Sequence, residues 1–283
     1  MFSRSAEGTL LYAGDASASG AHVTPSLSKD LTSPLVFPGA LADHGTSLRA
    51  AITRALVDFD LDMELSAGSR DGIFSFSSRE QTVLEAKSGL RLRVTPPDVG
   101  PWLAIRGTER KVSGDIALSG GGAPTLNLSL DQFRQDASGL SLKSHALMLN
   151  PWPAGGKVVS ADLKAFDLTN GPASFDLLSR GRLSLSGSIS GIDLKDTNIV
   201  GGLHVTRDDA GWQVTPDGAK CVSVNSQGFV FGSIQGKPVN LNVCPSGGEF
   251  IRRGDKSPSG AFTLGGVELP FSTGSTSGTM KLK

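Results

Sequence analysis

Residues 57–65 read Val-Asp-Phe-Asp-Leu-Asp-Met-Glu-Leu, and this stretch decides the fold class. Every odd position is apolar and every even position is acidic. Successive side chains of a β-strand point to opposite faces, so the stretch is predicted to form a strand with one apolar face and one hydrated face. A helix would spread the same residues around its axis and leave no apolar stripe to bury. The function therefore depends on what covers the apolar face.

Composition excludes several classes of partner. The chain of 283 residues carries 27 basic and 27 acidic residues, so no net charge attracts an anionic membrane surface, and nucleic acid is not an expected partner. Its 36 glycines are nearly twice the usual share of about 7% and favour turns over helices. No apolar run approaches the ~18 residues of a membrane-spanning helix. We expect a soluble chain, either an unexported protein or a piece of a longer one.

Short segments in which apolar and polar residues alternate follow 57–65 at intervals of roughly ten residues. This spacing predicts an all-β meander, sandwich, barrel or solenoid. The Gly-rich pieces at 120–122 and 200–202 are interpreted as hairpin turns and not as phosphate-binding loops. In 158–168 the apolar positions change parity midway, which indicates either a β-bulge or two shorter strands joined by a turn.

One amphipathic helix is expected near 46–56, with Thr46 or Ser47 as its N-cap. Its apolar stripe would plug an open end or edge of the sheet. Residues 13–45 are rich in Gly, Ala, Ser and Pro, and residues 1–45 are expected to form a loop-rich N-terminal segment with short strands. An elongated β-sheet domain is expected to cover 46–283.

The alternating segments nominate residues for the apolar face, which is also the candidate lipid groove. Such a face is a large exposed patch in a monomer, so lipid or a packed second sheet must occupy it. Trp102, Trp152 and Trp212 are interpreted as caps at the ends of this face, with ligand stacking as the alternative. The candidate residues of the face are Val57, Phe59, Leu61, Met63, Leu65, Leu90, Leu92, Val94, Leu126, Leu128 and Leu130.

Catalytic chemistry finds little support in the sequence. The histidines His22, His44, His145 and His204 are scattered, and none lies near Cys, Asp or Glu at metal-ligand spacing. Nucleophile-elbow, phosphate-loop and dinucleotide motifs are missing, so a β-rich hydrolase is the least supported class. The acidic residues of 57–65 stand about 7 Å apart in a row, too far apart to converge on one calcium ion. We expect neither an enzyme nor a bound cofactor or metal.

The two cysteines bracket a hairpin-like pair of strands near 221–245. Cys221 opens one strand and Cys244 closes another, so their Cα atoms could approach the separation of about 5.5 Å that is typical of a disulfide. Such a bond would contribute about 3 kcal/mol in the chain-entropy model and would indicate an oxidising compartment. Two buried reduced thiols are the alternative.

The motif Cys221-Val-Ser-Val, followed by Leu241-Asn-Val-Cys-Pro245, resembles the C-terminal region of YdbH-type proteins. The strand that follows the single expected helix and the paired segments of 111–130 have the same character. These proteins belong with the TamB- and AsmA-like envelope proteins of Gram-negative bacteria. The likeness covers most of the chain in its strand pattern, and its specific part is the cysteine–proline segment.

The resemblance implies a long, curved, largely antiparallel sheet with an open, taco-like groove, solenoid-like stacking and one short amphipathic helix. It implies a periplasmic, non-enzymatic conduit for phospholipid acyl chains between the inner and outer membranes. The partners would be a membrane-anchored remainder of a longer protein and an outer-membrane protein. The alternative is a closed β-sandwich or β-solenoid that serves as an extracellular or envelope structural or adhesion module without lipid cargo.

Overall fold

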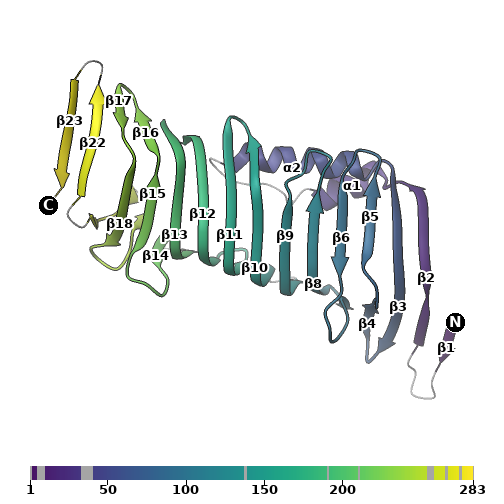
Figure 1. Ribbon diagram of the computed structural model, residues 1–283. Helices are drawn as coiled ribbons and strands as arrows, with labels where there is room; N and C mark the ends of the chain where they lie inside the picture. Colours follow the sequence, from purple (N-terminus) through teal and green to yellow (C-terminus); the bar gives the residue numbers. More distant parts are fainter. Residues whose placement is uncertain are drawn as a thin grey trace. The chain divides into compact units, whose positions relative to one another are not determined.

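The protein is all-β, and its strands belong to a large antiparallel sheet, which confirms the predicted fold class (Figure 1). Two helices accompany the strands in the part of the chain that the structure describes, one more than the sequence suggests. The chain divides into two compact units, Met1–Ala146 and Leu147–Lys283, called unit 1 and unit 2 below. The computed structural model describes residues 2–4, 10–32, 41–136, 139–189, 191–209, 211–253, 258–264, 267–273 and 276–282.

Unit 1 contains both helices and the first nine strands. The helices are α1 (Pro25–Thr32) and α2 (Ala42–Ala55). The strand after these nine, β10 (Gly139–Ala154), begins in unit 1 and ends in unit 2. The strands are β1 (Phe2–Arg4), β2 (Leu10–Ala21), β3 (Phe59–Arg70), β4 (Ile73–Ser77), β5 (Thr82–Ala86), β6 (Arg91–Thr95), β7 (Leu103–Arg106), β8 (Glu109–Ser119) and β9 (Leu126–Asp136).

Two long strands organise the sheet of unit 1. The first half of β3 pairs with β5 and its second half pairs with β4, while β2 pairs along its other edge. Strand β8 likewise receives β6 and β7 on one edge and β9 on the other. All of these pairings are antiparallel. Since each long strand holds two short ones in register, a single alternation pattern is carried across the unit.

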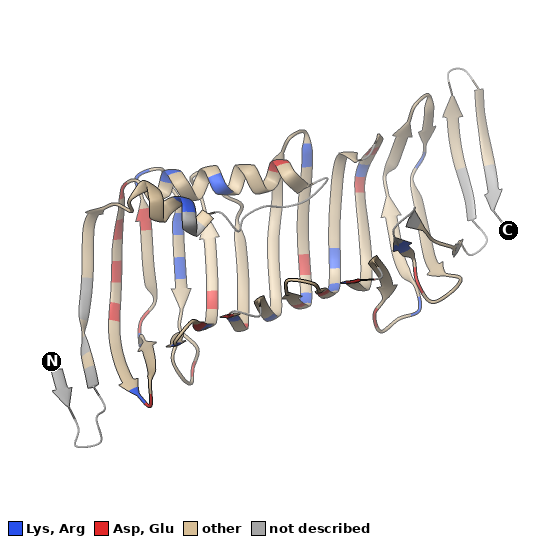
Figure 2. Cartoon of the chain, turned by 180° about the vertical axis from the view of Figure 1, so that it is seen from behind, with Lys and Arg blue, Asp and Glu red and all other residues tan. Residues whose placement is uncertain are grey.

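The predicted helix is present as α2, but it begins earlier than expected and its cap is different. Thr46 lies inside the helix, where its hydroxyl donates to the carbonyl of Ala42 at 3.1 Å, so it does not cap the N-terminus. The helix does not plug an edge of the sheet. Ala51 and Ala55 pack on Phe59 and Leu90, so α2 covers one end of a sheet face, and Figures 1 and 2 show both helices on the same side of the strands.

The expectation of a loop-rich N-terminal segment is wrong for most of its described part. Residues 10–21 form β2 and residues 25–32 form α1, whereas 33–40 lie outside the described residues. The small Ala, Ser and Gly side chains of β2 give a weak alternation signal. The strand forms because its backbone pairs with β3 from Leu10 to Ala21, so tertiary pairing overrides local preference.

The described residues of unit 2 form strands and the turns and loops that connect them, with no helix among them. The strands are the end of β10 followed by β11 (Lys157–Asn170), β12 (Phe175–Ile189), β13 (Ile192–Asp208), β14 (Gly211–Pro216), β15 (Val222–Ser226), β16 (Gly228–Phe231), β17 (Ile234–Gly236), β18 (Val239–Pro245), β19 (Ile251–Arg253), β20 (Pro258–Ser259), β21 (Phe262–Leu264), β22 (Val267–Thr273) and β23 (Thr276–Leu282).

Strand β13 is the centre of unit 2. One edge pairs with β12 over nearly its full length, and the other edge receives three short strands, β16, β15 and β14, one after another. Each short strand continues into an antiparallel branch: β15 pairs with β18, β14 with β19, and β16 with β17. The outermost described hairpin, β22–β23, is joined through β17.

The parity change in 158–168 is a β-bulge, as one of the two interpretations predicts. The segment lies within the continuous strand β11, and its register with β12 shifts between Leu163 and Ala165. The extra residue lets Ala161 and Phe166 point to the same face although their positions differ in parity. The bulge therefore keeps one face apolar through a change of register.

The Gly-rich piece at 120–122 is a turn between β8 and β9, as expected, but the one at 200–202 lies inside β13. Gly202 is required there because the backbone of Asp217 crosses it. A Cβ at Gly202 would stand 2.1 Å from the Asp217 carbonyl oxygen, and Asp217 N donates to Gly202 O at 2.9 Å. Arg180, which lies opposite Gly202 in β12, donates to both carboxylate oxygens of Asp217 and holds the pKa of that carboxyl below its usual value.

We predict that Gly202→Ala lowers the free energy of unfolding of the protein by about 1–3 kcal/mol, because the added methyl overlaps the Asp217 carbonyl. Gly247→Ala is the matched control, since nothing lies within 4 Å of its added Cβ. Chemical denaturation of the two variants measures the difference. Equal midpoints for both variants would contradict the close packing at Gly202.

Candidate functional site: the apolar faces of the sheet

In unit 1, strand register places apolar side chains on one face of the sheet. Directly opposed residues of neighbouring strands point to the same face, so a row of partners can be followed across the unit. We call this set apolar face 1. One row of it runs from Ala18 through Leu61, Leu84, Leu92 and Leu118 to Leu126. Parallel rows add Phe59, Met63, Leu65, Val94, Ile116, Leu128 and Leu130.

Nine of the eleven residues nominated from the sequence lie on apolar face 1. Val57 does not lie on this face. It lies in the turn after α2, before β3 begins, and it is 66% exposed. Leu90 precedes β6 and is buried at 4% exposure beneath α2. Both residues continue the alternation of their segments. Val57 lies in the turn after α2 and Leu90 lies between β5 and β6, so neither belongs to a strand. Leu84 and Leu118 belong to the face and were not nominated, although alternation in their own segments marks them.

Helix α2 covers only part of apolar face 1. The buried cluster consists of Ala51, Ala55, Phe59, Ala86 and Leu90, all at the end of the strands where the helix lies. Among the described apolar residues of unit 1, the other one that is buried is Leu130. The rest of the face, including Leu65, Val94 and Leu128, is only half-buried. No second sheet packs on it within the residues that the structure describes.

Unit 2 has its own apolar face, which we call apolar face 2. Its central row runs from Ala161 through Leu183, Ile199 and Val224 to Leu241, and a second row contains Leu168, Leu177, Val205, Val214 and Ile251. The buried apolar residues described in unit 2 are Trp152, Val159, Val222 and Phe250, while Ile251 is 49% exposed. None of these residues was among the groove candidates, although Trp152 was expected to cap an end of the apolar face and the alternation along β11 to β13 marks the residues of those three strands.

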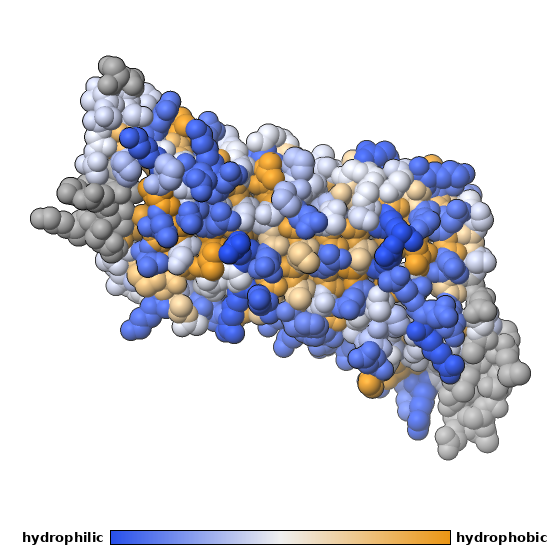
Figure 3. Space-filling model, viewed as in Figure 1, coloured by the Kyte–Doolittle hydropathy of each residue, from blue (hydrophilic) through white to orange (hydrophobic). Residues whose placement is uncertain are grey.

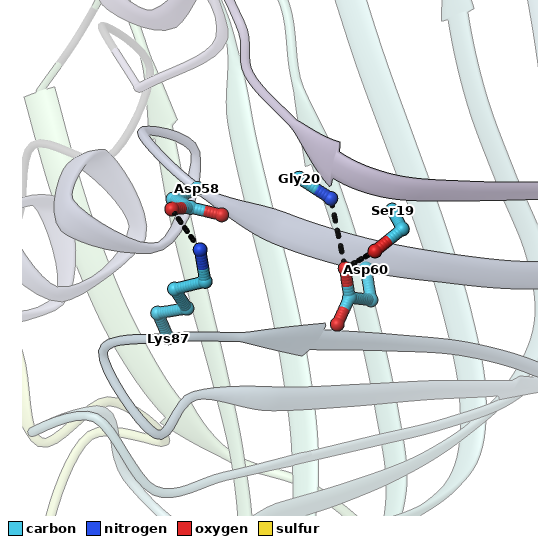
Figure 4. Close-up of polar contacts among 5 residues, drawn as sticks. All are labelled: Ser19, Gly20, Asp58, Asp60 and Lys87. Atoms are coloured by element: carbon cyan, nitrogen blue, oxygen red, sulfur yellow. Dashed lines mark hydrogen bonds and ion pairs between the residues drawn. The ribbon is translucent and has the colours of Figure 1, made fainter.

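The opposite face of unit 1 carries the acidic residues of β3. Asp60 Oδ1 accepts from Gly20 N and Ser19 Oγ, each at 2.9 Å, and Lys87 Nζ lies 2.6 Å from Asp58 Oδ2 (Figure 4). Glu85 of β5 is opposite Asp60 in the ladder, and Arg91 of β6 neutralises its charge. Its Oε1 lies 2.7 Å from Arg91 Nε. Figure 3 views the side away from the helices, where hydrophilic residues lie among apolar areas.

These contacts shift two ionisation equilibria. The backbone amide of Gly20 and the Ser19 hydroxyl hold the pKa of Asp60 below its ordinary value. The Asp58 carboxylate raises the pKa of Lys87 above its ordinary value. Asp60 of β3 therefore links β3 to β2, and Asp58, just before β3, links that strand to the turn after β5. In the described residues no three Asp, Glu, His or Cys side chains are placed to hold a metal ion.

The predicted disulfide is present between Cys221 and Cys244. Cys221 immediately precedes β15 and Cys244 lies near the end of β18, and Val222 is directly opposite Val243 in the ladder. The strands therefore bring the two Cα atoms within 4.2 Å.

Neither described helix is long and apolar enough to cross a membrane.

Comparisons of the chain with protein-family models, with curated proteins and with solved structures found no match. The fold and the two faces define an antiparallel β-protein in which each unit presents one apolar face.

We predict that Asp60 of β3 makes the stability of the protein depend on pH. The pKa of Asp60 is lowered by folding, so its stabilising contribution is present above its ordinary value of 3.8 and is lost as the pH falls through the lower folded-state value. Asp60→Asn should lower the melting temperature at pH 7, and the gap to the unaltered protein should close in acid. Asp62→Asn, on the same strand face but without a described hydrogen bond, is the control and should leave the melting temperature at pH 7 unchanged.

Removing the disulfide gives a second prediction for this region. Cys221→Ser with Cys244→Ser should reduce the free energy of unfolding by about 3 kcal/mol, because the bond closes a loop with a sequence separation of 23 residues. Guanidinium denaturation measures the change, and reductant added to the unaltered protein should reproduce it. A loss below about 0.5 kcal/mol in both cases would show that the strands alone hold this region.

Proposed function

We propose that this protein is a non-enzymatic lipid-binding protein whose apolar faces bind acyl chains. The observation that carries the proposal is the half-buried state of these faces. In unit 1, α2 covers one end of apolar face 1, and Leu65, Val94 and Leu128 retain contact with solvent. In unit 2 the rows around Ile199 and Val205 are equally without a described covering layer. Exposed apolar areas of this kind are typical of interaction sites.

The dimensions of the faces suit an acyl chain. Along β13, the residues from Ile199 to Val205 span about 20 Å at roughly 3.3 Å per residue. One leaflet of a bilayer, half of a hydrocarbon core of about 30 Å, is about 15 Å deep. A chain laid along the strands can therefore contact apolar side chains over its whole length.

The energetics favour reversible binding. A fully buried acyl chain gains about 0.8 kcal/mol per methylene, so about 14 methylenes contribute about 11 kcal/mol, and contact with one open face gives about half of that. Association costs about 4–15 kcal/mol in lost freedom of motion. A single chain would therefore bind weakly and exchange readily, which is what a conduit requires.

The more specific part of the proposal is transport. We propose that the faces carry phospholipids between the inner and outer membranes of a Gram-negative envelope, as the resemblance to YdbH-type proteins implies. A membrane-anchored part of a longer protein and an outer-membrane protein would be the partners. The disulfide supports an oxidising compartment such as the periplasm, because such bonds are rare in the reducing cytosol.

The rival function is an envelope structural or adhesion module without lipid. It requires a dry core, in which the apolar faces are covered by protein. The described residues show a continuous buried cluster only beneath α2, so the rival has less support.

Photocrosslinking tests lipid binding at single residues. A benzophenone side chain at Leu128, on apolar face 1, should crosslink phospholipid in protein purified without detergent, and the same group at Leu183 should do so on apolar face 2. The matched controls are Asn127 and Arg182, their neighbours on the opposite face. Mass spectrometry should find lipid adducts at Leu128 and Leu183 and none at the controls. Absence of lipid adducts at all four positions would favour the rival function.

A further inference from the structure

The apolar row of β13 ends in a positive charge. Ile199, Leu203, Val205 and Arg207 all occupy alternate positions on apolar face 2, so their side chains leave the same side of the strand. Arg207 is the last of them, one residue before β13 ends at Asp208. A charged side chain at the end of an apolar row requires its own explanation, because a cation on an apolar surface is costly to desolvate.

Two aromatic rings flank this arginine. Phe175 of β12 and Trp212 of β14 are both directly opposite Arg207 in the ladder. Arg207 Cζ lies 5.4 Å from the centroid of the Trp212 ring, and the Phe175 and Trp212 centroids are 5.3 Å apart at an interplanar angle of 53°. The cation–π contact orients the guanidinium over the indole without using its N–H donors on an acceptor.

No carboxylate neutralises Arg207 within the described residues. The neighbouring acid Asp176 lies on the other face, where it contacts His204 Nε2 at 3.1 Å. Arg252 of β19 is likewise on the other face, 4.0 Å from Glu249. Arg207 is half-buried and Trp212 is 38% exposed, so both can be reached from solvent. The guanidinium is thus held in place with its donors available for an anion.

We propose that Arg207 and Trp212 bind the phosphate group of a glycerophospholipid whose acyl chains lie along the row from Val205 to Ile199. This inference rests on the proposed lipid-binding function and adds a headgroup site to it. A guanidinium presents paired donors that match two phosphate oxygens, and a fixed planar group makes this match more favourable than a flexible ammonium does. Tryptophan suits the boundary, because its ring contacts the acyl region while its indole N–H faces the polar end.

The site gives the lipid a defined orientation. The phosphate lies at the row of opposed residues Phe175, Arg207 and Trp212, near the ends of β12, β13 and β14. The acyl chains run from there over the next apolar row, which contains Leu177, Val205 and Val214. The charge complementarity favours a phosphate over a neutral headgroup, and the length of the apolar row favours a chain of bilayer length.

Binding of two soluble lipids by the intact protein tests the site. Dioctanoyl phosphatidylglycerol has the phosphate, and dioctanoylglycerol has the same chains without it. Calorimetric titration should show that the protein binds the phospholipid about 10-fold more tightly, as one well-placed charged hydrogen-bonding pair allows. Arg207→Gln should reduce this preference to about twofold or less, because only the phospholipid loses a charged partner.

Two control variants separate the role of Arg207 from general charge. Arg182→Gln removes a cation from the opposite face of β12 and should keep the full preference. Arg207→Lys keeps the charge without the planar fork and should give an intermediate preference. Octanoate supplies a carboxylate probe, whose binding should depend on Arg207 less than that of the phospholipid does.

The outcomes are distinguishable. An Arg207→Gln variant that folds, as judged by its melting temperature, and keeps the full preference would overturn the headgroup site. Equal losses for Arg207→Gln and Arg182→Gln would overturn it as well, since the effect would then be one of net charge. A greater loss for octanoate than for the phospholipid would overturn the assignment to phosphate. If the unaltered protein binds neither dioctanoyl lipid, the lipid-binding function itself fails.

Discussion

The backbone ladder between antiparallel strands is the constraint on which the rest of this structure depends. Because opposed residues share a face, one correct register between β3 and β5 aligns Leu61 with Leu84, and the next registers extend the row to Leu118. A slip by one residue anywhere would exchange the apolar and polar faces beyond it. The polar links of Asp58 and Asp60 stabilise this register, because Asp58 contacts Lys87 after β5 and Asp60 accepts hydrogen bonds from Ser19 and Gly20 of β2.

Strand irregularities preserve the two faces where alternation alone would fail. The bulge between Leu163 and Ala165 inserts a residue in β11, so Phe166 returns to the face of Ala161. Gly202 performs a different task, because it lets the chain around Asp217 cross β13 closely enough for Arg180 to reach the carboxylate. Both features lie in long strands, where an accumulated mismatch of twist or register has to be absorbed.

Alternation in the sequence predicted the fold class and the strand at β3, because both depend on local residue order, and it gave the bulge in β11 as one of two interpretations. The disulfide was expected because the two cysteines bracket a pair of strand-like segments, with reduced thiols as the alternative. Alternation failed where a partner strand decides the structure. The small residues of β2 form a strand only through pairing with β3, and Gly202 reads as a turn until the path of Asp217 is known. For the candidate site, parity placed Met63 and Leu128 correctly but could not show that Val57 precedes the strand or that Leu90 lies under α2.

The branching of unit 2 around β13 makes its stability hierarchical. The hairpins of β11, β12 and β13 close short loops, whereas β15 to β18 attach to β13 by brief ladders enclosed within the covalent loop of Cys221 and Cys244. Reduction would restore chain freedom to that branch and leave the long hairpins intact, so opening would be sub-global rather than complete. In amide hydrogen exchange, β15 to β18 would then behave as a foldon separate from β11–β13. The protection of their amides against exchange would depend on the redox potential of the surroundings.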